Sequence, residues 1–218
     1  MRNFTAAAVL AAVSGSASAD VITSYVSFGQ PGDQGATPVG TVAANVSALP
    51  LTRGAGLSGN AGGNSLNSAG WDSLDSTDYI TLGFEVAPGY QVDLDTFWMG
   101  TRSSGTGPGN LGVFSNVDGF TSPVFTFAQS GTSYTNSVAD MSALTGLTGS
   151  VEFRIIALNS VSVSGGSISS TGTFRLGDHY DGANYSEVRF EGSVSQIPAP
   201  ASAALMGLGG LVAARRRR

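Results

Sequence analysis

Apolar and polar residues alternate along much of the chain with the period of two that is typical of β-strands with one buried face. The clearest run is 78–87, where alternate side chains are apolar: Ile80, Leu82, Phe84 and Val86. After the turn residues Pro88 and Gly89, the pattern resumes over 90–101, with Leu94 and Trp98 on the apolar face. These two runs predict an antiparallel hairpin that places Trp98 in the core.

Other segments follow the same pattern. The run 150–158 is apolar on both faces, which indicates a central strand, and 185–194 alternates clearly. A run at 21–28 places Phe28 on one face with Ile22. The stretch 50–77 is dominated by Gly, Asn, Ser and Asp, which predicts a long loop.

The pattern predicts an all-β fold over residues 20–196, namely an antiparallel β-sandwich of jelly-roll type. Strand-like runs follow one another at short intervals, and none of this segment has the period of an amphipathic helix. A β-helix or solenoid is the alternative, although no fixed repeat period supports it.

The first 19 residues have the features of a secretory signal peptide. Arg2 supplies a positive start, 6–13 is apolar, and Ala17-Ser18-Ala19 is a small-x-small cleavage pattern. We therefore expect a signal-peptide helix, cleavage by signal peptidase and a mature chain that begins at Asp20.

The last 22 residues, 197–218, place an apolar run between two prolines and four terminal arginines. As a helix, 201–214 would be roughly 21 Å long at about 1.5 Å per residue, which is short for a bilayer core of about 30 Å. The arginines favour a cytoplasmic C-terminus. We expect a short hydrophobic helix that holds the chain transiently in the inner membrane; a plain C-terminal membrane anchor is the alternative.

This order of features resembles the PEP-CTERM sorting signal, which is also catalogued as an ice-binding-protein C-terminal motif. The matching residues are Pro198, Ala199, Pro200, the Leu/Gly/Ala run, and Arg215, Arg216, Arg217 and Arg218; the usual glutamate between the prolines is Ala199 here. The resemblance implies removal of the segment by an exosortase, a membrane transpeptidase-like cysteine enzyme. It also implies export to the envelope or extracellular polymer matrix of a Gram-negative-type bacterium.

Charge restricts the partners of the segment between the two ends. All fifteen acidic residues but only five of the ten arginines lie in 20–196, which gives it a formal net charge of −10. Such a domain repels phosphate backbones, so no nucleic-acid partner is expected. Because cysteine is absent, disulfides, thiolate zinc sites and cysteine nucleophiles are excluded.

The segment around the only histidine is a candidate metal or acid–base site. Asp178, His179 and Asp181 lie close together in sequence, and histidine titrates near neutrality. The same residues suit an ordinary turn, which is the alternative. A hydrolase that uses them is a further hypothesis, although no Gly-x-Ser-x-Gly nucleophile motif accompanies them.

Two groups of aspartates are candidate calcium ligands, because hard cations favour carboxylate oxygens. The first group is Asp72, Asp75 and Asp78, and the second is Asp93 and Asp95. Both groups also suit ordinary solvent-exposed positions. Apart from calcium, no cofactor is expected.

Aromatic side chains offer a different kind of site, because a sugar ring can lie flat against them. Trp71, Trp98 and Tyr180 are the candidates, and Trp71 is favoured because it lies in the predicted polar loop. Extracellular polysaccharide is the partner that this hypothesis implies. The sequence thus predicts a non-enzymatic, exported envelope or matrix protein, with a carbohydrate-binding module and a hydrolase as alternatives.

Overall fold

The computed structural model describes residues 19–180 and 183–198. In this part of the chain the elements are β-strands and one short 3₁₀ turn, η1 (Asn116–Asp118). The strands are β1 (Asp20–Tyr25), β2 (Ala36–Thr37), β3 (Val39–Val42), β4 (Val46–Arg53), β5 (Ser58–Gly59), β6 (Ser65–Ala69), β7 (Tyr79–Val86), β8 (Tyr90–Ser103), β9 (Asn110–Ser115), β10 (Pro123–Ala128), β11 (Thr135–Asp140), β12 (Gly149–Ala157), β13 (Thr173–Gly177), β14 (His179–Tyr180), β15 (Tyr185–Ser186) and β16 (Val188–Gln196). The predicted all-β fold is confirmed. The two predicted terminal helices lie outside the described residues, and no described helix is long and apolar enough to cross a membrane.

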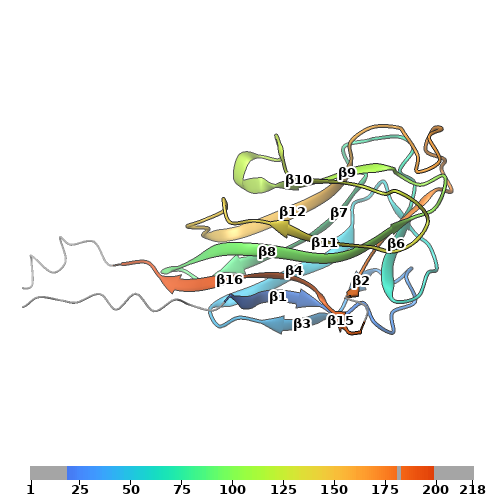
Figure 1. Ribbon diagram of the computed structural model, residues 1–218. Coiled ribbons are helices and arrows are strands. Elements are labelled where there is room, and N and C mark those ends of the chain that lie inside the picture. Colours follow the sequence, from blue (N-terminus) through green and yellow to red (C-terminus); the bar gives the residue numbers. More distant parts are fainter. Residues whose placement is uncertain (1–18, 181–182, 199–218) are drawn as a thin grey trace, which may run out of the picture.

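Two antiparallel sheets make up the body, in an arrangement consistent with a β-sandwich (Figure 1). The first sheet has the order β3-β1-β16-β8-β13-β6-β5, and β11 also pairs with β8. The second has the order β10-β9-β12-β7-β4-β2. As predicted from its apolar faces, β12 is central and pairs with both β7 and β9.

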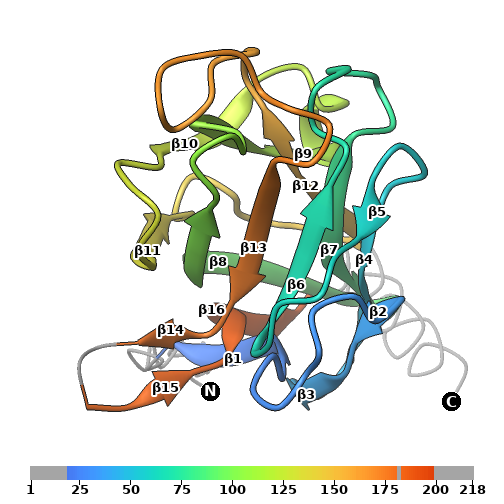
Figure 2. The same ribbon diagram turned by 90° about the vertical axis from the view of Figure 1, so that its right-hand side faces the viewer.

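The long strand β8 joins the two halves of the first sheet. Along one edge it pairs with β16 over 90–98 and then with β13 over 100–103, while β11 pairs with its other edge. Between β13 and β16 the chain forms the separate hairpin β14–β15, which extends away from the body (Figure 2).

The predicted hairpin of β7 and β8 is wrong, because the two strands lie in different sheets. β7 pairs with β12 and β4, and the turn after it carries the chain across to the first sheet. This turn is closed by a 3.1 Å hydrogen bond from the Tyr90 N–H to the Ala87 carbonyl. Crossing between sheets brings both apolar faces into one core. Alternation predicts which face is buried, but it does not identify the neighbouring strand.

A β-bulge interrupts β8 at Asp95, where the register with β16 shifts by one residue. The Asp95 carbonyl accepts a 2.9 Å hydrogen bond from the Met141 N–H, so its carbonyl is satisfied outside the ladder. Opposite the bulge, a Cβ on Gly192 would lie 2.2 Å from the Asp93 carbonyl oxygen. Glycine is therefore required opposite the bulge.

The bulge reverses the alternation of side chains along β8. Val92 and Leu94 are in the core before it, and Phe97 and Met99 are in the core after it. Trp98 consequently lies on the outer face, half-buried, and the prediction that it shares the core face with Leu94 is wrong. One extra residue moves every later side chain to the opposite face.

Stacked phenylalanines fill the space between the sheets. Phe190 of β16 stacks on Phe97 of the same sheet at 4.4 Å and on Phe153 of the second sheet at 4.6 Å, measured between ring centroids. Phe84 meets Phe190 edge-on at 6.0 Å. All four side chains are fully buried, and aromatic side chains of this size dominate core energetics.

Tyr25 ties the first sheet to the second through its buried hydroxyl group. The hydroxyl oxygen lies 2.8 Å from the Leu49 carbonyl and 2.7 Å from the Gly83 carbonyl, and it accepts the Gly83 N–H at 3.0 Å. Burial raises the pKa of Tyr25 to about 12, against the opposing effect of the Gly83 hydrogen bond. Gly83 has φ +154°, and a Cβ there would lie 2.1 Å from the Val151 carbonyl oxygen. The close approach of β7 to β12 at this position therefore requires glycine.

The region 50–77, predicted as a long loop, contains the end of β4 and all of β5 and β6. Every residue of β6 is buried, although most are polar. The Arg53 guanidinium supplies partners: it donates to the Asn67 carbonyl at 2.7 Å, to Ser68 Oγ at 3.0 Å and to the Gly32 carbonyl at 2.5 Å. A polar strand can be buried here because Arg53 and the neighbouring loop satisfy many of its polar groups, although Asn67 Oδ1 has no hydrogen-bond partner.

The beginning of β1 and the end of β16 lie at the same side of the sandwich. Asp20 pairs with Gly192 near the end of β16, whereas Tyr25 pairs with Val188 at its beginning. β16 spans roughly 26 Å between these two sides, at about 3.3 Å per residue. The described strands thus all fall between the predicted terminal segments 1–19 and 197–218.

Candidate functional site

A small hollow lies beside hairpin β14–β15, on the side of the sandwich where β16 begins. It encloses about 140 Å³. This is less than the 300–1,000 Å³ typical of pockets that enclose drug-sized ligands, so it suits one ring or one chain end of a larger ligand. The hollow is lined by Gly63, Asn64, Tyr134, Asp178, Tyr180 and Tyr185.

Three exposed aromatic side chains form a surface at this hollow, which we call the aromatic surface: Phe28 is 58% exposed, Tyr180 39% and Tyr185 58%. Tyr180 and Tyr185 are partners across the hairpin, and their rings stack at 4.6 Å. The Phe28 ring lies 5.8 Å from that of Tyr185 and is tilted by 46°. Clustered exposed aromatic rings are typical of binding surfaces.

Polar residues of the hollow hold the turn that carries Phe28. Asp178 Oδ1 accepts a hydrogen bond from the Ser27 N–H at 3.2 Å, and Asn64 Oδ1 accepts one from the Gly29 N–H at 2.8 Å. The backbone is thus held on both sides of Phe28. A ring fixed in this way loses little conformational freedom when a ligand binds.

Asn136 of β11 fixes the hairpin in a similar way. Its Oδ1 accepts the Tyr180 N–H at 2.9 Å, and its Nδ2 donates to the Tyr180 carbonyl. Next to Tyr180, the buried His179 ring meets Trp98 edge-on at 4.9 Å. The hairpin is therefore attached to β11 through its backbone and to β8 through a ring contact.

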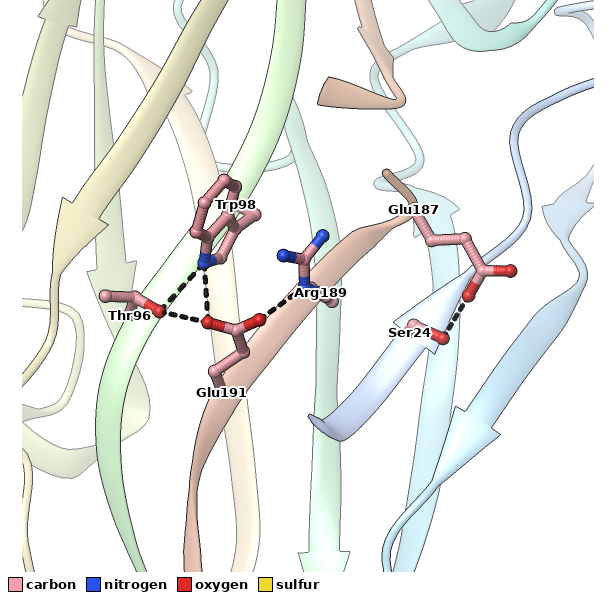
Figure 3. Close-up of polar contacts among 6 residues, drawn as sticks. All are labelled: Ser24, Thr96, Trp98, Glu187, Arg189 and Glu191. Carbon is pink, nitrogen blue, oxygen red and sulfur yellow. Dashed lines mark hydrogen bonds and ion pairs between the residues drawn. The ribbon is translucent and has the colours of Figure 1, made fainter. Parts of the chain in front are cut away.

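The hollow contains a buried carboxyl group with a second acid nearby. Burial raises the pKa of Asp178; the hydrogen bond from Ser27 opposes this effect, and the negative charge of Glu187 adds to it. Glu187 itself accepts a hydrogen bond from Ser24 Oγ (Figure 3). Carboxylate oxygens only accept hydrogen bonds, so this side of the hollow suits ligands that present hydroxyl groups.

A second polar cluster holds Trp98 on the outer face of the first sheet (Figure 3). The indole Nε1 donates to Glu191 at 2.8 Å and to Thr96 at 2.9 Å, and the Arg189 guanidinium lies 4.3 Å over the ring. Glu191 also pairs with Arg189 at 2.7 Å. Burial opposes ionisation of Glu191, but hydrogen bonds from Arg189, Thr96 and Trp98 together lower its pKa. These contacts occupy one face and the N–H of the indole, so Trp98 is less suited to stacking on a ligand.

The structure separates the residues of the predicted metal or acid–base site. Asp178 lines the hollow, whereas the His179 ring packs on Trp98, and Asp181 lies outside the described residues. Over 19–180 and 183–198, no three His, Asp or Glu side chains gather in a group that could hold a metal ion.

The prediction that Trp71 is an exposed sugar platform is wrong. Its side chain is fully buried, and its ring packs edge-on against Phe174 at 5.6 Å. The indole N–H donates to the Ser68 carbonyl at 3.0 Å. This hydrogen bond satisfies the only polar group of the Trp71 side chain, so the ring can be buried. Trp71, which comes soon after the buried strand β6, therefore lies in the core.

The candidate calcium ligands hold turns instead of facing a common point. Asp75 Oδ1 accepts hydrogen bonds from the Thr77 N–H and hydroxyl group, and its pKa is lowered mainly by the Thr77 N–H. Asp78 Oδ2 accepts from Ser73 Oγ and from the Asp75 N–H, while Asp72 is exposed.

The second pair of candidate calcium ligands is divided by the bulge. Asp93 Oδ1 accepts the Gly146 N–H at 2.6 Å, and Asp95 is the bulged residue. The carboxylate of Asp93 therefore fixes a neighbouring loop.

The predicted processing sites lie at the limits of the described chain. Asp20 begins β1, and Pro198 follows β16 after Ile197. Ala19 is described, whereas Ala17, Ala199, Pro200 and Arg215–218 lie outside the described residues.

Sequence reasoning missed most of the aromatic surface. It placed Phe28 on a core face with Ile22, but β1 ends at Tyr25 and Phe28 is exposed. The turn-forming Gly29 and Pro31 directly after Phe28 were the available signal. Tyr180 was among the candidates, and Tyr185 flanks the other side of an Asp-Gly turn signal.

Comparisons with protein-family models, with curated proteins and with solved structures find no match to this chain.

Proposed function

We propose that this protein is exported, held in the inner membrane by its C-terminal segment, and released into the cell envelope or extracellular matrix by an exosortase-like enzyme. The placement of the strand ends supports this proposal best. β1 begins at Asp20, the expected first mature residue, and β16 ends at Gln196, just before the C-terminal segment. Removal of 1–19 and 197–218 would leave every described strand intact.

The C-terminal segment has the features that such processing requires. Its arginines would stay on the cytoplasmic side, and its apolar run is short enough to be held only marginally by the bilayer. The acidic body would lie outside, arranged as a jelly-roll-type sandwich between the two terminal helices. Its net negative charge disfavours adhesion to anionic membrane surfaces.

A structural role for the body, without catalysis, is part of this proposal. Asp178 accepts the Ser27 N–H and so fixes a turn, and the His179 ring is buried against Trp98. These contacts give both residues a structural purpose. A hydrolase alternative would be supported by a turnover that is lost in His179→Ala while the fold is retained.

Intact mass spectrometry tests the proposal directly. We expect protein from export-competent cells to begin at Asp20 and to lack the arginine tail, and protein from cells without the exosortase-like enzyme to end at Arg218 in the membrane fraction. Replacing Arg215–218 by glutamine should lower the processed fraction. The matched control replaces Arg102 and Arg175 in the body by glutamine and should leave processing unchanged. Cytosolic protein with both terminal segments intact would refute the proposal.

A further inference from the structure

We infer that the hollow and the aromatic surface together form a binding site for a neutral, hydroxyl-rich glycan. The location of the ligand outside the cell rests on the proposed export, whereas the contacts of the site do not. The residues that carry the inference are Phe28, Asn64, Asp178, Tyr180 and Tyr185.

The arrangement of the rings fits a sugar chain. The negative face of an aromatic ring attracts the positively polarised C–H groups on the flat side of a pyranose. Tyr180 and Tyr185 stack on each other at an inclination of 30°, so a sugar would contact their outer faces and edges, and Phe28 is inclined by 46° to Tyr185. Such a surface follows a twisted, soluble chain better than the flat face of a crystalline polymer.

The polar groups beside the rings complete the site. Asp178 and Asn64 line the hollow and carry carbonyl-type oxygens that accept hydrogen bonds from sugar hydroxyls. Burial raises the pKa of Tyr134, against the hydrogen bond with Ser65, so its hydroxyl stays protonated and able to donate. Asp178 and the nearby Glu187 disfavour polyuronates by like-charge repulsion, which favours a neutral ligand.

The size of the surface favours a glycan over a folded protein partner. An aromatic side chain presents about 150–250 Å², so three rings that are about half exposed offer roughly 300 Å². A stable protein interface needs about 800 Å² on each partner. A few sugar units can cover the smaller area completely.

The site also faces away from the proposed membrane attachment. It lies where β16 begins, and the C-terminal segment follows where β16 ends, roughly 26 Å away at about 3.3 Å per residue. In Figure 1 the end of β16 lies at the left and β15 at the right. A chain attached through its C-terminus would therefore present this site toward the surrounding polymer.

A glycan array tests the inference with the full-length chain, purified in a detergent without a sugar headgroup. The array should include neutral glucans, galactans and mannans together with anionic polyuronates. We expect binding to at least one neutral glycan, and calorimetry with that glycan should show about tenfold or greater weakening in Phe28→Ala and in Tyr185→Ala, because each substitution removes one ring that contacts the sugar. Tyr185→Phe keeps the ring and should bind as the unchanged chain does.

Phe120→Ala is the matched control, because this half-buried ring contacts Arg154 on the outer face of the second sheet. It should bind unchanged. The inference is overturned if no neutral glycan binds, if both ring variants bind normally, or if only polyuronates bind and Arg102→Gln or Arg175→Gln abolishes that binding. Intact mass spectrometry tests export and processing, whereas the glycan array tests the binding site. Failure of one proposal can therefore be distinguished from failure of the other.

Discussion

Two groups of aromatic side chains in this protein share their chemistry but differ in their surroundings. The core group consists of Phe84, Phe97, Phe153 and Phe190, which are fully buried. The surface group consists of Phe28, Tyr180 and Tyr185, which are each more than a third exposed. The core rings lie on strands that are paired along both edges, whereas the surface rings lie on a turn and on a two-stranded hairpin.

The difference shows how the same residue type serves stability in one place and recognition in another. Strand pairing and the opposite sheet hold the core rings, so losing one leaves a cavity. Backbone N–H groups next to the surface rings donate hydrogen bonds to Asp178, Asn64 and Asn136, and these bonds hold the rings, so the rings can be replaced without disturbing the sheets. Substitutions of the core rings should therefore lower the free energy of unfolding much more than substitutions of the surface rings.

The largest effect is expected from Phe190→Ala. This ring contacts Phe84, Phe97 and Phe153, and truncating a buried phenylalanine leaves a cavity that costs about 3–5 kcal/mol. Urea unfolding of the full-length chain should show the loss as a lower midpoint. A change below about 1 kcal/mol would contradict the assignment of this ring to the centre of the core.

A smaller effect, which depends on pH, is expected at Tyr25. Its pKa is raised from 10.0 to about 12, so the folded value lies above the unfolded one. The stabilisation from the neutral phenol is complete below pH 10 and is lost as the pH rises to about 12. At 1.36 kcal/mol per pKa unit, the loss is about 2–3 kcal/mol.

Tyr25→Phe should remove this dependence, and it should also lower stability at neutral pH by about 1–3 kcal/mol because the Gly83 N–H loses its buried acceptor. The measurement is the free energy of unfolding between about pH 8 and pH 12. The exposed Tyr185→Phe serves as the control and should keep the full alkaline loss. If Tyr25→Phe and Tyr185→Phe showed the same dependence of the free energy of unfolding on pH, the proposed role of the buried Tyr25 hydroxyl in joining the two sheets would be wrong.

The smallest effect on stability is expected at the aromatic surface. Tyr185→Ala and Phe28→Ala remove exposed rings and should change the free energy of unfolding by about 0.5 kcal/mol or less. The same variants should lose glycan binding about tenfold. A destabilisation comparable with that of Phe190→Ala would show that these rings support the fold, and the contrast between the two groups would then disappear.

The alternation of apolar and polar residues was enough to predict those strands whose own alternation is not interrupted by a bulge. β12 reads as apolar on both faces and is central, and β16 buries Val188 and Phe190 as its pattern indicates. β12 keeps an unbroken register with both neighbours, and the extra residues opposite β16 lie in β1 and β8, so the alternation within both strands is undisturbed and local sequence was sufficient.

Prediction failed where a distant contact changed the local pattern. The bulge at Asp95 depends on Gly192, nearly a hundred residues later, and it decided the orientation of Trp98. The buried polar strand β6 depends on Arg53 and on a loop before β2. The aromatic surface depends on Asp178 and Asn64, which hold a turn more than thirty residues away from either.

The pairing of β16 between β1 and β8 has a consequence for the order of assembly. A chain that is synthesised from its N-terminus must wait for its last strand before the centre of the first sheet can close. Until then β1 and β8 each present an open edge that invites aberrant pairing with other chains. Completion of the sheet is thereby coupled to the arrival of Gln196, so the protein becomes fully folded only when its entire body has emerged.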